Sequence, residues 1–513
     1  MFNRGNTLMF VNHPLIKTGL IESREYQINI AKNSIEQNTL VVAPTALGKT
    51  VIAVLLAAEF LKLHPEKKIL ILAPTRPLAA QHMARFRDFL NLDESKINLL
   101  TGHTKPSTRA KIWMDSHVIS ATPHTVLNDV RNGEYTLDDV SLVIFDEAHR
   151  AVGEYPYCPL AEKINSRILA LTASPGGDIK TISAVKKRLK IKAIEIRDET
   201  DRDVSNHIKG IKVEWKKITL PEPYWVIRNL FLNLLRERLK QLKREGVISR
   251  ASTEVSKKDF LDLMASLKKK VSSGGHKELF PSISAVSGCM TILHAVDLLE
   301  TQGIAPLHDY LKRTELKAKS PKSSKAIQKL VASRDFKRAV SITNATKEQY
   351  SDPKIEALKE IISKSERDTK IIIFTQYRDT VKEIIANINQ LDGVRAVRFI
   401  GQAHKRADPG MSQKKQLETL DEFKKGVYNV LVATSVAEEG LDIPSVDLVI
   451  FYEPVPSEIR MIQRRGRTGR TRMGQVIVLM AAKTRDESFY WSSIAKEKRM
   501  KKSLRTFKNQ TLD

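Results

Sequence analysis

Residues 39–63 read TLVVAPTALGKTVIAVLLAAEFLKL, and this stretch decides the fold class of the N-terminal part of the chain. A short apolar run rich in β-branched residues leads into a loop, and a long apolar run follows. The loop, residues 43–50, has the spacing of a phosphate-binding loop with Ala43 in place of the first glycine. Because backbone N–H groups at a helix N-terminus can wrap nucleotide phosphates, the stretch predicts an α/β domain with a nucleotide site here.

Two side chains of this loop are suited to ATP chemistry. We expect Lys49 to reach the β and γ phosphates and the Thr50 hydroxyl to bind Mg²⁺. The other loop residues expected to surround the nucleotide are Thr45, Ala46, Leu47 and Gly48. ATP and Mg²⁺ are therefore the predicted cofactors.

A second motif ends another apolar run. Residues 142–149 read LVIFDEAH, so a strand delivers two carboxylates to its C-terminal end, where open α/β sheets place their ligands. Asp146 is expected to hold Mg²⁺ through water, and Glu147 to orient or deprotonate the attacking water. His149 completes the motif and is counted with the catalytic residues. The alternative, an ordinary acidic strand end, is disfavoured by the phosphate-binding loop upstream.

A third motif is rich in arginine. Residues 463–470 read QRRGRTGR, and phosphoryl transfer needs positive charge on the γ-phosphate oxygens. Gln463, Arg467 and Arg470 are therefore counted with the catalytic residues, the alternative being a solvated basic loop. If these arginines complete the site, ATP lies between two parts of the chain and hydrolysis opens and closes a cleft.

The layout of apolar runs predicts two α/β blocks, because short β-branched runs alternate with helical patterns as in parallel sheets covered on both faces. The runs of the first block are 39–43, 69–73, 117–121, 141–146 and 168–172. The runs of the second block are 370–374, 396–400, 429–433, 447–451 and 475–480. We expect three domains, at residues 1–220, 221–350 and 351–513.

The middle region is basic and has helical periodicity. Residues 222–350 hold 24 Lys and Arg against 13 Asp and Glu, within a chain whose net charge is +26. Lys268, Lys269, Lys270 and the stretch 317–329 stand out. Such a field favours a polyanion, with nucleic acid first and an anionic membrane second; the alternative for the clusters is a solvated helical face.

Membrane insertion and disulfide chemistry are not expected. The longest apolar run, residues 51–58, is short for a spanning helix. Cys158 and Cys289 lie far apart and form no metal-ligand pair, which favours a reducing intracellular setting.

Together these motifs resemble those of superfamily 2 helicases over nearly the whole chain. The resemblance implies two RecA-like α/β domains with a helical insert, forming an ATP-driven motor on nucleic acid. It assigns adenine reading to Arg24 and Gln27, the coupling of hydrolysis to domain movement to residues 171–175, and contacts bridging ATP and strand to Gly440 and Asp442. The residues that it assigns to strand contacts are Thr75, Arg76, Pro77, Thr101, Gly102, Thr122, Pro123, His124, Gln376, Gly401, Gln402, Thr434 and Ser435.

A narrower resemblance rests on four segments. Residues 146–153, 171–176, 399–403 and 410–416 are similar to the archaeal Hef helicase and the Fanconi anaemia M translocase family. The family carries a helical insert and acts on branched DNA such as stalled forks and Holliday junctions. It implies forked or branched DNA and repair proteins as partners, no membrane, and an archaeal cytoplasm or nucleoid. Related duplex-RNA sensors of innate immunity share the insert position, so a duplex-RNA-dependent ATPase stays an alternative.

The sequence departs from this family at its C-terminal end. Many Hef proteins continue into a nuclease domain, whereas this sequence ends at Asp513 without a second acidic constellation, so we expect no nuclease activity from it. A catalytically silent nucleic-acid-binding protein is the last alternative. The presence of Lys49, Asp146 and Glu147 together with the arginine motif argues against it.

Overall fold

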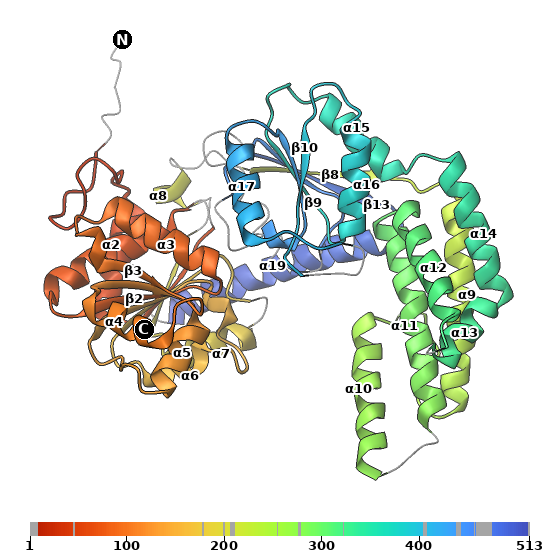
Figure 1. Ribbon diagram of the computed structural model, residues 1–513, viewed down its shortest axis with the longest axis horizontal. Coiled ribbons are helices and arrows are strands. Elements are labelled where there is room, and N and C mark those ends of the chain that lie inside the picture. Colours follow the sequence, from red (N-terminus) through yellow and green to blue (C-terminus); the bar gives the residue numbers. More distant parts are fainter. Residues whose placement is uncertain are drawn as a thin grey trace.

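The computed structural model shows two parallel sheets and a helical bundle, with the bundle beside the second sheet (Figure 1). The structure describes residues 9–44, 47–176, 179–197, 201–205, 211–253, 255–274, 279–321, 323–403, 408–437, 443–455, 457 and 474–510. The predicted fold class, two α/β domains with a helical insert, is confirmed.

Among the described residues, the first sheet has seven strands, all paired in parallel. Their spatial order is β3 (Ile97–Leu100), β4 (Val118–Ala121), β2 (Lys68–Leu72), β5 (Val140–Phe145), β6 (Arg167–Thr172), β1 (Thr39–Val42) and β7 (Ala193–Ile196). The five central strands contain residues of the five apolar runs expected in this block, and the two outermost strands were not predicted. Outer strands are only half-covered and carry polar residues, so their apolar signal is weak.

Helices cover both faces of this sheet. One face packs against α1 (Glu25–Glu36), α2 (Lys49–Leu63) and α3 (Arg76–Phe89). The other packs against α4 (Pro106–Asp115), α5 (Pro123–Arg131), α6 (Tyr157–Lys163) and α7 (Ile179–Arg188). The short helix α8 (Arg202–Ser205) follows β7.

The second sheet has six parallel strands in the part of the chain that the structure describes. Their order is β10 (Ala396–Phe399), β11 (Val430–Ala433), β9 (Ile371–Phe374), β12 (Leu448–Phe451), β13 (Gly474–Ala481) and β8 (Ile211–Ile218). One face is covered by α15 (Pro353–Ser363) and α16 (Arg378–Ile388), and the other by α17 (Gln413–Lys424) and α19 (Arg485–Gln510).

Strand β8 corrects the expected domain division. It pairs with β13 along its whole length and so belongs to the second sheet, although residues 1–220 were assigned to the first domain. The chain therefore enters the second sheet before it forms the bundle and returns afterwards. The alternating charges of β8, KVEWKK at residues 212–217, hid it from a search for apolar runs.

The bundle contains six helices among the described residues. They are α9 (Glu222–Arg244), α10 (Lys257–Gly274), α11 (Phe280–Thr301), α12 (Ile304–Ala318), α13 (Lys325–Ala332) and α14 (Arg334–Gln349). Of the described helices, α11 alone is long and apolar enough to cross a membrane, but 61% of its most apolar window is buried. It lies in the bundle core with α9, which accounts for its composition without a bilayer.

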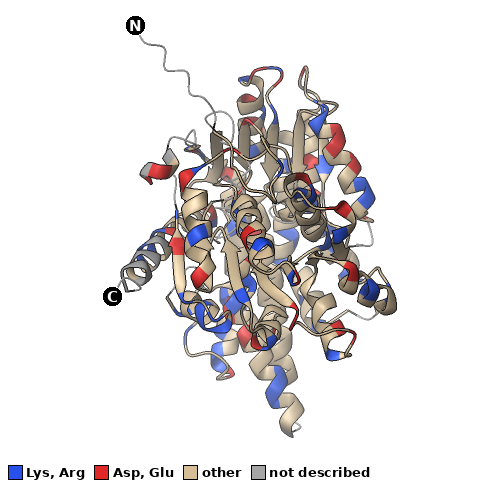
Figure 2. Ribbon diagram, turned by 90° about the vertical axis from the view of Figure 1, so that its left-hand side faces the viewer, with Lys and Arg blue, Asp and Glu red and all other residues tan. Residues whose placement is uncertain are grey.

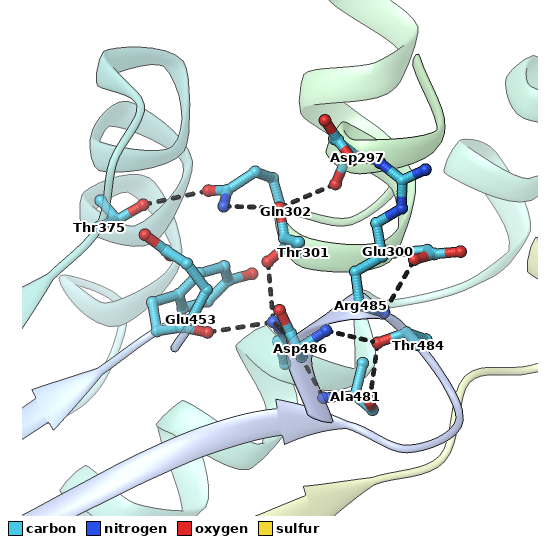
Figure 3. Close-up of polar contacts among 12 residues, drawn as sticks. Asp297, Glu300, Thr301, Gln302, Thr375, Glu453, Ala481, Thr484, Arg485 and Asp486 are labelled. Carbon is cyan, nitrogen blue, oxygen red and sulfur yellow. Dashed lines mark hydrogen bonds and ion pairs between the residues drawn. The ribbon is translucent and has the colours of Figure 1, made fainter. Parts of the chain in front are cut away.

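A buried polar cluster joins the bundle to the second domain (Figure 3). The Lys354 ammonium, at the start of α15, donates to Thr301 O at 2.8 Å, Tyr452 O at 3.1 Å and Asp486 Oδ2 at 2.6 Å. Thr301 is the last residue of α11, so the charge lies at the negative end of that helix. Gln302 Oε1 then accepts hydrogen bonds from the hydroxyls of two residues of the second domain. These contacts fix the bundle to the second sheet.

Helix α19 connects the two sheets. It begins at Arg485, next to Asp486 of the polar cluster, packs Tyr490 on the second sheet, and places Met500 in the core of the first domain (Figure 1). Within the described part of the chain, α19 therefore contacts both motor domains.

Candidate ATP and nucleic-acid site

The predicted site residues of the first domain follow the carboxyl ends of its strands. Because all strands of this sheet are parallel, these ends meet at one edge. The phosphate-binding loop follows β1, and Asp146 follows β5 directly. The edge therefore brings together residues that lie far apart in the sequence.

The phosphate-binding loop requires glycine at its turn into α2. Gly48 has φ +68° and precedes the helix, and a Cβ at this position would lie 2.7 Å from Gln27 Nε2. The left-handed backbone favours glycine at this position, and a Cβ would displace the Gln27 amide. Lys49 is 8% exposed, and its ammonium donates to Ala43 O at 2.8 Å. Thr50 follows it in the first turn of α2.

The resemblance assigned adenine reading to Gln27, and the structure gives this residue a contact with the loop. Gln27 Nε2 and the Tyr26 hydroxyl each donate to Leu47 O at 3.0 Å. Both side chains are buried and hold the loop from α1. Arg24 pairs with Glu22 at 2.8 Å. Adenine contacts of Arg24 and Gln27 stay a prediction.

The carboxylates of Asp146 and Glu147 are both largely buried at the end of β5. Burial opposes ionisation of Asp146, but the His82 ring and the Lys49 ammonium outweigh it and hold the pKa of Asp146 below its ordinary value. An ionised, buried carboxylate beside Lys49 and near the start of α2 suits a divalent cation with bound phosphates. The residues present therefore fit Mg²⁺ and a nucleotide.

Glu147 has an uncommon backbone for its residue type. Its φ of 49° and ψ of 51° lie in the left-handed region, which costs free energy for a residue with a Cβ and is typical of functional sites. Glu147 Oε2 lies 3.3 Å from His149 Nδ1, and that nitrogen lies 3.2 Å from Thr172 Oγ1. His149 thus links the carboxylate to the end of β6.

The chain of contacts continues from β6 to α19. The Thr172 hydroxyl donates to Ser174 O at 2.9 Å, and the Ser174 hydroxyl lies 2.8 Å from Met500 Sδ. The residues that the resemblance assigns to coupling of hydrolysis and movement thus lie between the acidic motif and the helix that reaches the second domain. Sequence reasoning did not find Met500, because a lone methionine in a basic helix carries no signal.

The predicted strand-contact residues of the first domain lie on three loops of the same edge. Thr75 caps α3, with its hydroxyl 3.4 Å from Leu78 N, and Arg76 and Pro77 form the first turn. Thr101 and Gly102 follow β3, whereas Thr122, Pro123 and His124 open α5. His124 and Gly102 are exposed, and Thr101 is buried.

A buried ion pair that the sequence analysis missed holds two of these loops. Arg109 Nε donates to Asp129 Oδ2 at 2.7 Å, and a second guanidinium nitrogen contacts Asp129 Oδ1. A third nitrogen donates to Thr104 O, in the loop after β3. The pair joins α4 to α5, so it fixes the loops that precede both helices. Spacing in the sequence gave no signal for this contact.

The second domain presents its predicted contacts at the ends of β9, β10 and β11. Gln376 is exposed, and its backbone N–H donates to Glu453 Oε1 at 2.6 Å. Gly401 O accepts from Arg378 Nη2 at 2.7 Å, and Gln402 beside it is exposed. Thr434 is 7% exposed, and Ser435 next to it is exposed.

Several predicted residues lie outside the described part of the chain. They are Thr45, Ala46, Gly440, Asp442, Gln463, Arg467 and Arg470. Their roles stay predictions. Lys268, Lys269 and Lys270 are described and exposed near the C-terminal end of α10, which projects away from both sheets (Figures 1 and 2).

Comparison with protein families matches three successive parts of the chain. Residues 24–182 match the family described as "DEAD/DEAH box helicase", and residues 353–472 match "Helicase conserved C-terminal domain". Residues 223–350 match "Putative ATP-dependent RNA helicase, helical bundle". The two sheets, the phosphate-binding loop and the acidic motif define the class, and the chain belongs to superfamily 2 of the ATP-dependent helicases.

The narrower resemblance is confirmed by a solved structure. The Pyrococcus furiosus Hef helicase domain superposes with a TM-score of 0.71 and is 44% identical, over 93% of this chain and 100% of that one. A Methanocaldococcus jannaschii protein named "Putative ATP-dependent RNA helicase MJ1505" is 42% identical over 97% of this chain and 62% of its own length. The Neurospora crassa "ATP-dependent DNA helicase mph1" is 33% identical over 91% of this chain and 41% of its own length. The chain thus spans about two-fifths to three-fifths of these two relatives.

Proposed function

We propose that the protein is an ATP-driven translocase that remodels or unwinds forked and branched DNA in repair. The observation that carries the proposal is the shared edge of the first sheet, where the nucleotide loop, the acidic motif and three predicted strand-contact loops all emerge. Strand binding and ATP hydrolysis at one edge can influence each other through short, rigid elements. DNA as the substrate is supported by the names of the Neurospora relative and its fungal counterparts.

In the proposed reaction, Lys49 leaves its contact with Ala43 O and binds the β and γ phosphates of ATP. Asp146 and Thr50 would hold Mg²⁺, which when bound neutralises charge on the phosphates. Glu147 would orient the attacking water and accept its proton. Arg467, Arg470 and Gln463 would complete the site from the second domain.

Movement follows from where the parts are fixed. The polar cluster around Lys354 fixes the bundle to the second domain, so both should move together against the first domain. The strand contacts of the two domains would then approach and separate in each ATP cycle, while α19 remains attached to both. An archaeal cytoplasm or nucleoid is the proposed setting, supported by the archaeal relatives.

Duplex RNA is the second candidate substrate. It is favoured by the names of the Methanocaldococcus relative and of the family that matches the bundle. An A-form duplex presents 2′-hydroxyl groups and a wide, shallow minor groove, so a site built for it would distinguish RNA from DNA of the same sequence.

The test is a panel of labelled substrates of matched sequence. ATPase stimulation and ATP-dependent strand separation are measured on forked, four-way, flap and linear DNA and on duplex RNA, with Lys49→Ala as the inactive control. We expect forked or four-way DNA to stimulate most and the variant to lose turnover by about 100-fold or more. Stronger stimulation of the ATPase by duplex RNA would identify RNA rather than DNA as the substrate. No stimulation by any substrate would favour a binding protein without catalytic activity.

A further inference from the structure

His82 joins the acidic motif to the helix that carries a predicted strand contact. It lies on α3, is 6% exposed, and its Nε2 is 2.9 Å from Asp146 Oδ2. Because a carboxylate accepts hydrogen bonds, Nε2 carries the proton and donates. The other ring nitrogen, Nδ1, is buried and has no hydrogen-bond partner among the described residues. The ring therefore makes one directed contact, and that contact is with Asp146.

The first turn of α3 carries predicted strand contacts, Arg76 and Pro77. The helix has 14 residues and begins at Arg76, which Thr75 caps. His82 lies six positions after Arg76, about 9 Å along the axis of an α-helix. Between them, Ala79 is fully buried and its carbonyl accepts from the Ser120 hydroxyl at 2.7 Å. Arg76 and His82 lie in one continuous helix, so hydrogen-bonded backbone joins the first turn of α3 to the residue that contacts Asp146.

We propose that His82 is a positioning residue that couples strand binding at the first turn of α3 to the orientation of the Asp146 carboxylate. Hydrogen bonds to a metal-binding carboxylate orient it, and losing such a partner typically costs about 10- to 100-fold in metal affinity or activity. If α3 shifts when a strand binds, the carboxylate shifts with it. Thermodynamic linkage then requires that the bound nucleotide change strand affinity by the same factor. The inference rests on the proposed role of Asp146.

The experiment measures this coupling directly by binding, without turnover. The affinity of the full chain for a fluorescent, non-hydrolysable ATP analogue with Mg²⁺ is titrated with and without saturating single-stranded DNA. The affinity for DNA is then measured with and without the analogue. We expect a coupling factor in the range of about 5 to 150 for the wild type, equal in both directions.

Four variants separate coupling from general damage. His82→Leu and His82→Asn should bring the coupling factor close to one, since leucine has no donor and asparagine is too short to reach Asp146. His82→Gln, whose amide reaches the position of Nε2, should restore most of the coupling. Ser120→Ala is the matched control, because it removes a buried hydrogen bond to the α3 backbone without touching Asp146, and it should keep the wild-type factor.

The outcomes distinguish this inference from the proposed function. A wild type without coupling, full coupling in His82→Leu and His82→Asn, or equal loss in Ser120→Ala would each overturn the role of His82. Asp146→Ala is measured in parallel. If that variant keeps Mg²⁺-dependent binding of the analogue, the assignment of Asp146 itself fails. If it loses Mg²⁺ dependence while the His82 variants behave as wild type, the failure belongs to the inference alone.

Discussion

At the scale of single residues, Glu147 combines the features expected of the group that activates water. Its carboxylate is largely buried, its backbone is left-handed, and His149 lies 3.3 Å away. Glu147→Gln keeps the shape and leaves Asp146 intact. We expect ATP to bind but turnover to fall by about 10²- to 10⁴-fold, because the base is lost. The measurement is ATPase rate together with nucleotide retained on DNA-bound protein.

The control for this substitution is Glu154→Gln, at an exposed position just beyond the acidic motif. It should leave both the rate and the retained nucleotide unchanged. Normal turnover in Glu147→Gln would show that another group orients the water.

The sequence predicted residues whose chemistry is tied to a local motif. Lys49 and Asp146 lie a few residues after apolar strands. Their position at the sheet edge can therefore be predicted from their place in the sequence. His82 and Arg109 could not be found in this way. Each lies within a helix and acquires its role from a partner on another element, Asp146 or Asp129, which spacing along the sequence does not reveal.

At the scale of elements, strands were predictable where both faces are buried. The central strands of both sheets appear as continuous apolar runs, as expected of parallel sheets covered on both sides. The edge strand β8 has alternating exposed charges, and its burial depends on β13, which lies far along the chain. Helix α11, by contrast, is strongly apolar. Its composition reflects its position in the core of the bundle.

Helix α10 provides a test at this scale. Lys268, Lys269 and Lys270 are exposed at its projecting end, remote from the sheet edge that holds the catalytic residues (Figure 1). Replacing all three by Gln should weaken forked or four-way DNA more than single-stranded DNA. Loss of three phosphate contacts would lower the salt slope on duplex by up to about 2.7. The measurement is a pair of salt-dependent titrations, fork against single strand, with ATPase at saturating single strand as the internal check.

A charge-matched control variant replaces Lys62, Lys163 and Lys192 by Gln. These exposed lysines precede strands of the first sheet, at the edge opposite the site. This variant should bind forked and single-stranded DNA with nearly the wild-type affinity. Equal losses on fork and single strand for the α10 variant, or no loss at all, would remove α10 as the source of branch recognition.

At the scale of the whole molecule, the junction between bundle and second domain is what the sequence could not show. Its contacts bring together α11, α12, α15, α16 and α19, which are separated by long stretches of chain. Lys354 is 1% exposed and Asp486 is fully buried, so two charged residues serve as a core contact. Only the completed fold supplies the partners that allow such charges to be buried.

The junction also contains a histidine whose protonation should affect the stability of the folded protein. His294 of α11 packs against Tyr310 of α12, with ring centroids 4.8 Å apart, and against Tyr377 of the second domain at 5.9 Å. Burial, with smaller effects of Lys257 and Arg313, lowers the pKa of His294 to about 4. The ordinary pKa of histidine, about 6.5, applies in the unfolded chain.

The sign of the pH dependence follows from these two values. Below pH 6.5 the unfolded chain takes up a proton that the folded chain refuses until about pH 4, so the stabilising effect of the neutral ring is complete above pH 6.5 and is lost as the pH falls toward 4. With allowance for solvent screening of a partly exposed ring, the loss of unfolding free energy between pH 7 and pH 5 should be about 1 kcal/mol.

His294→Phe keeps an aromatic ring against Tyr310 and removes the titration. We therefore expect the denaturation midpoint of the bundle to fall less on acidification in this variant than in the wild type. His64→Phe, at an exposed position after α2, is the control and should keep the wild-type slope. Wild-type pH dependence in His294→Phe would assign the proton uptake to another group and leave the junction without a titrating residue at that contact.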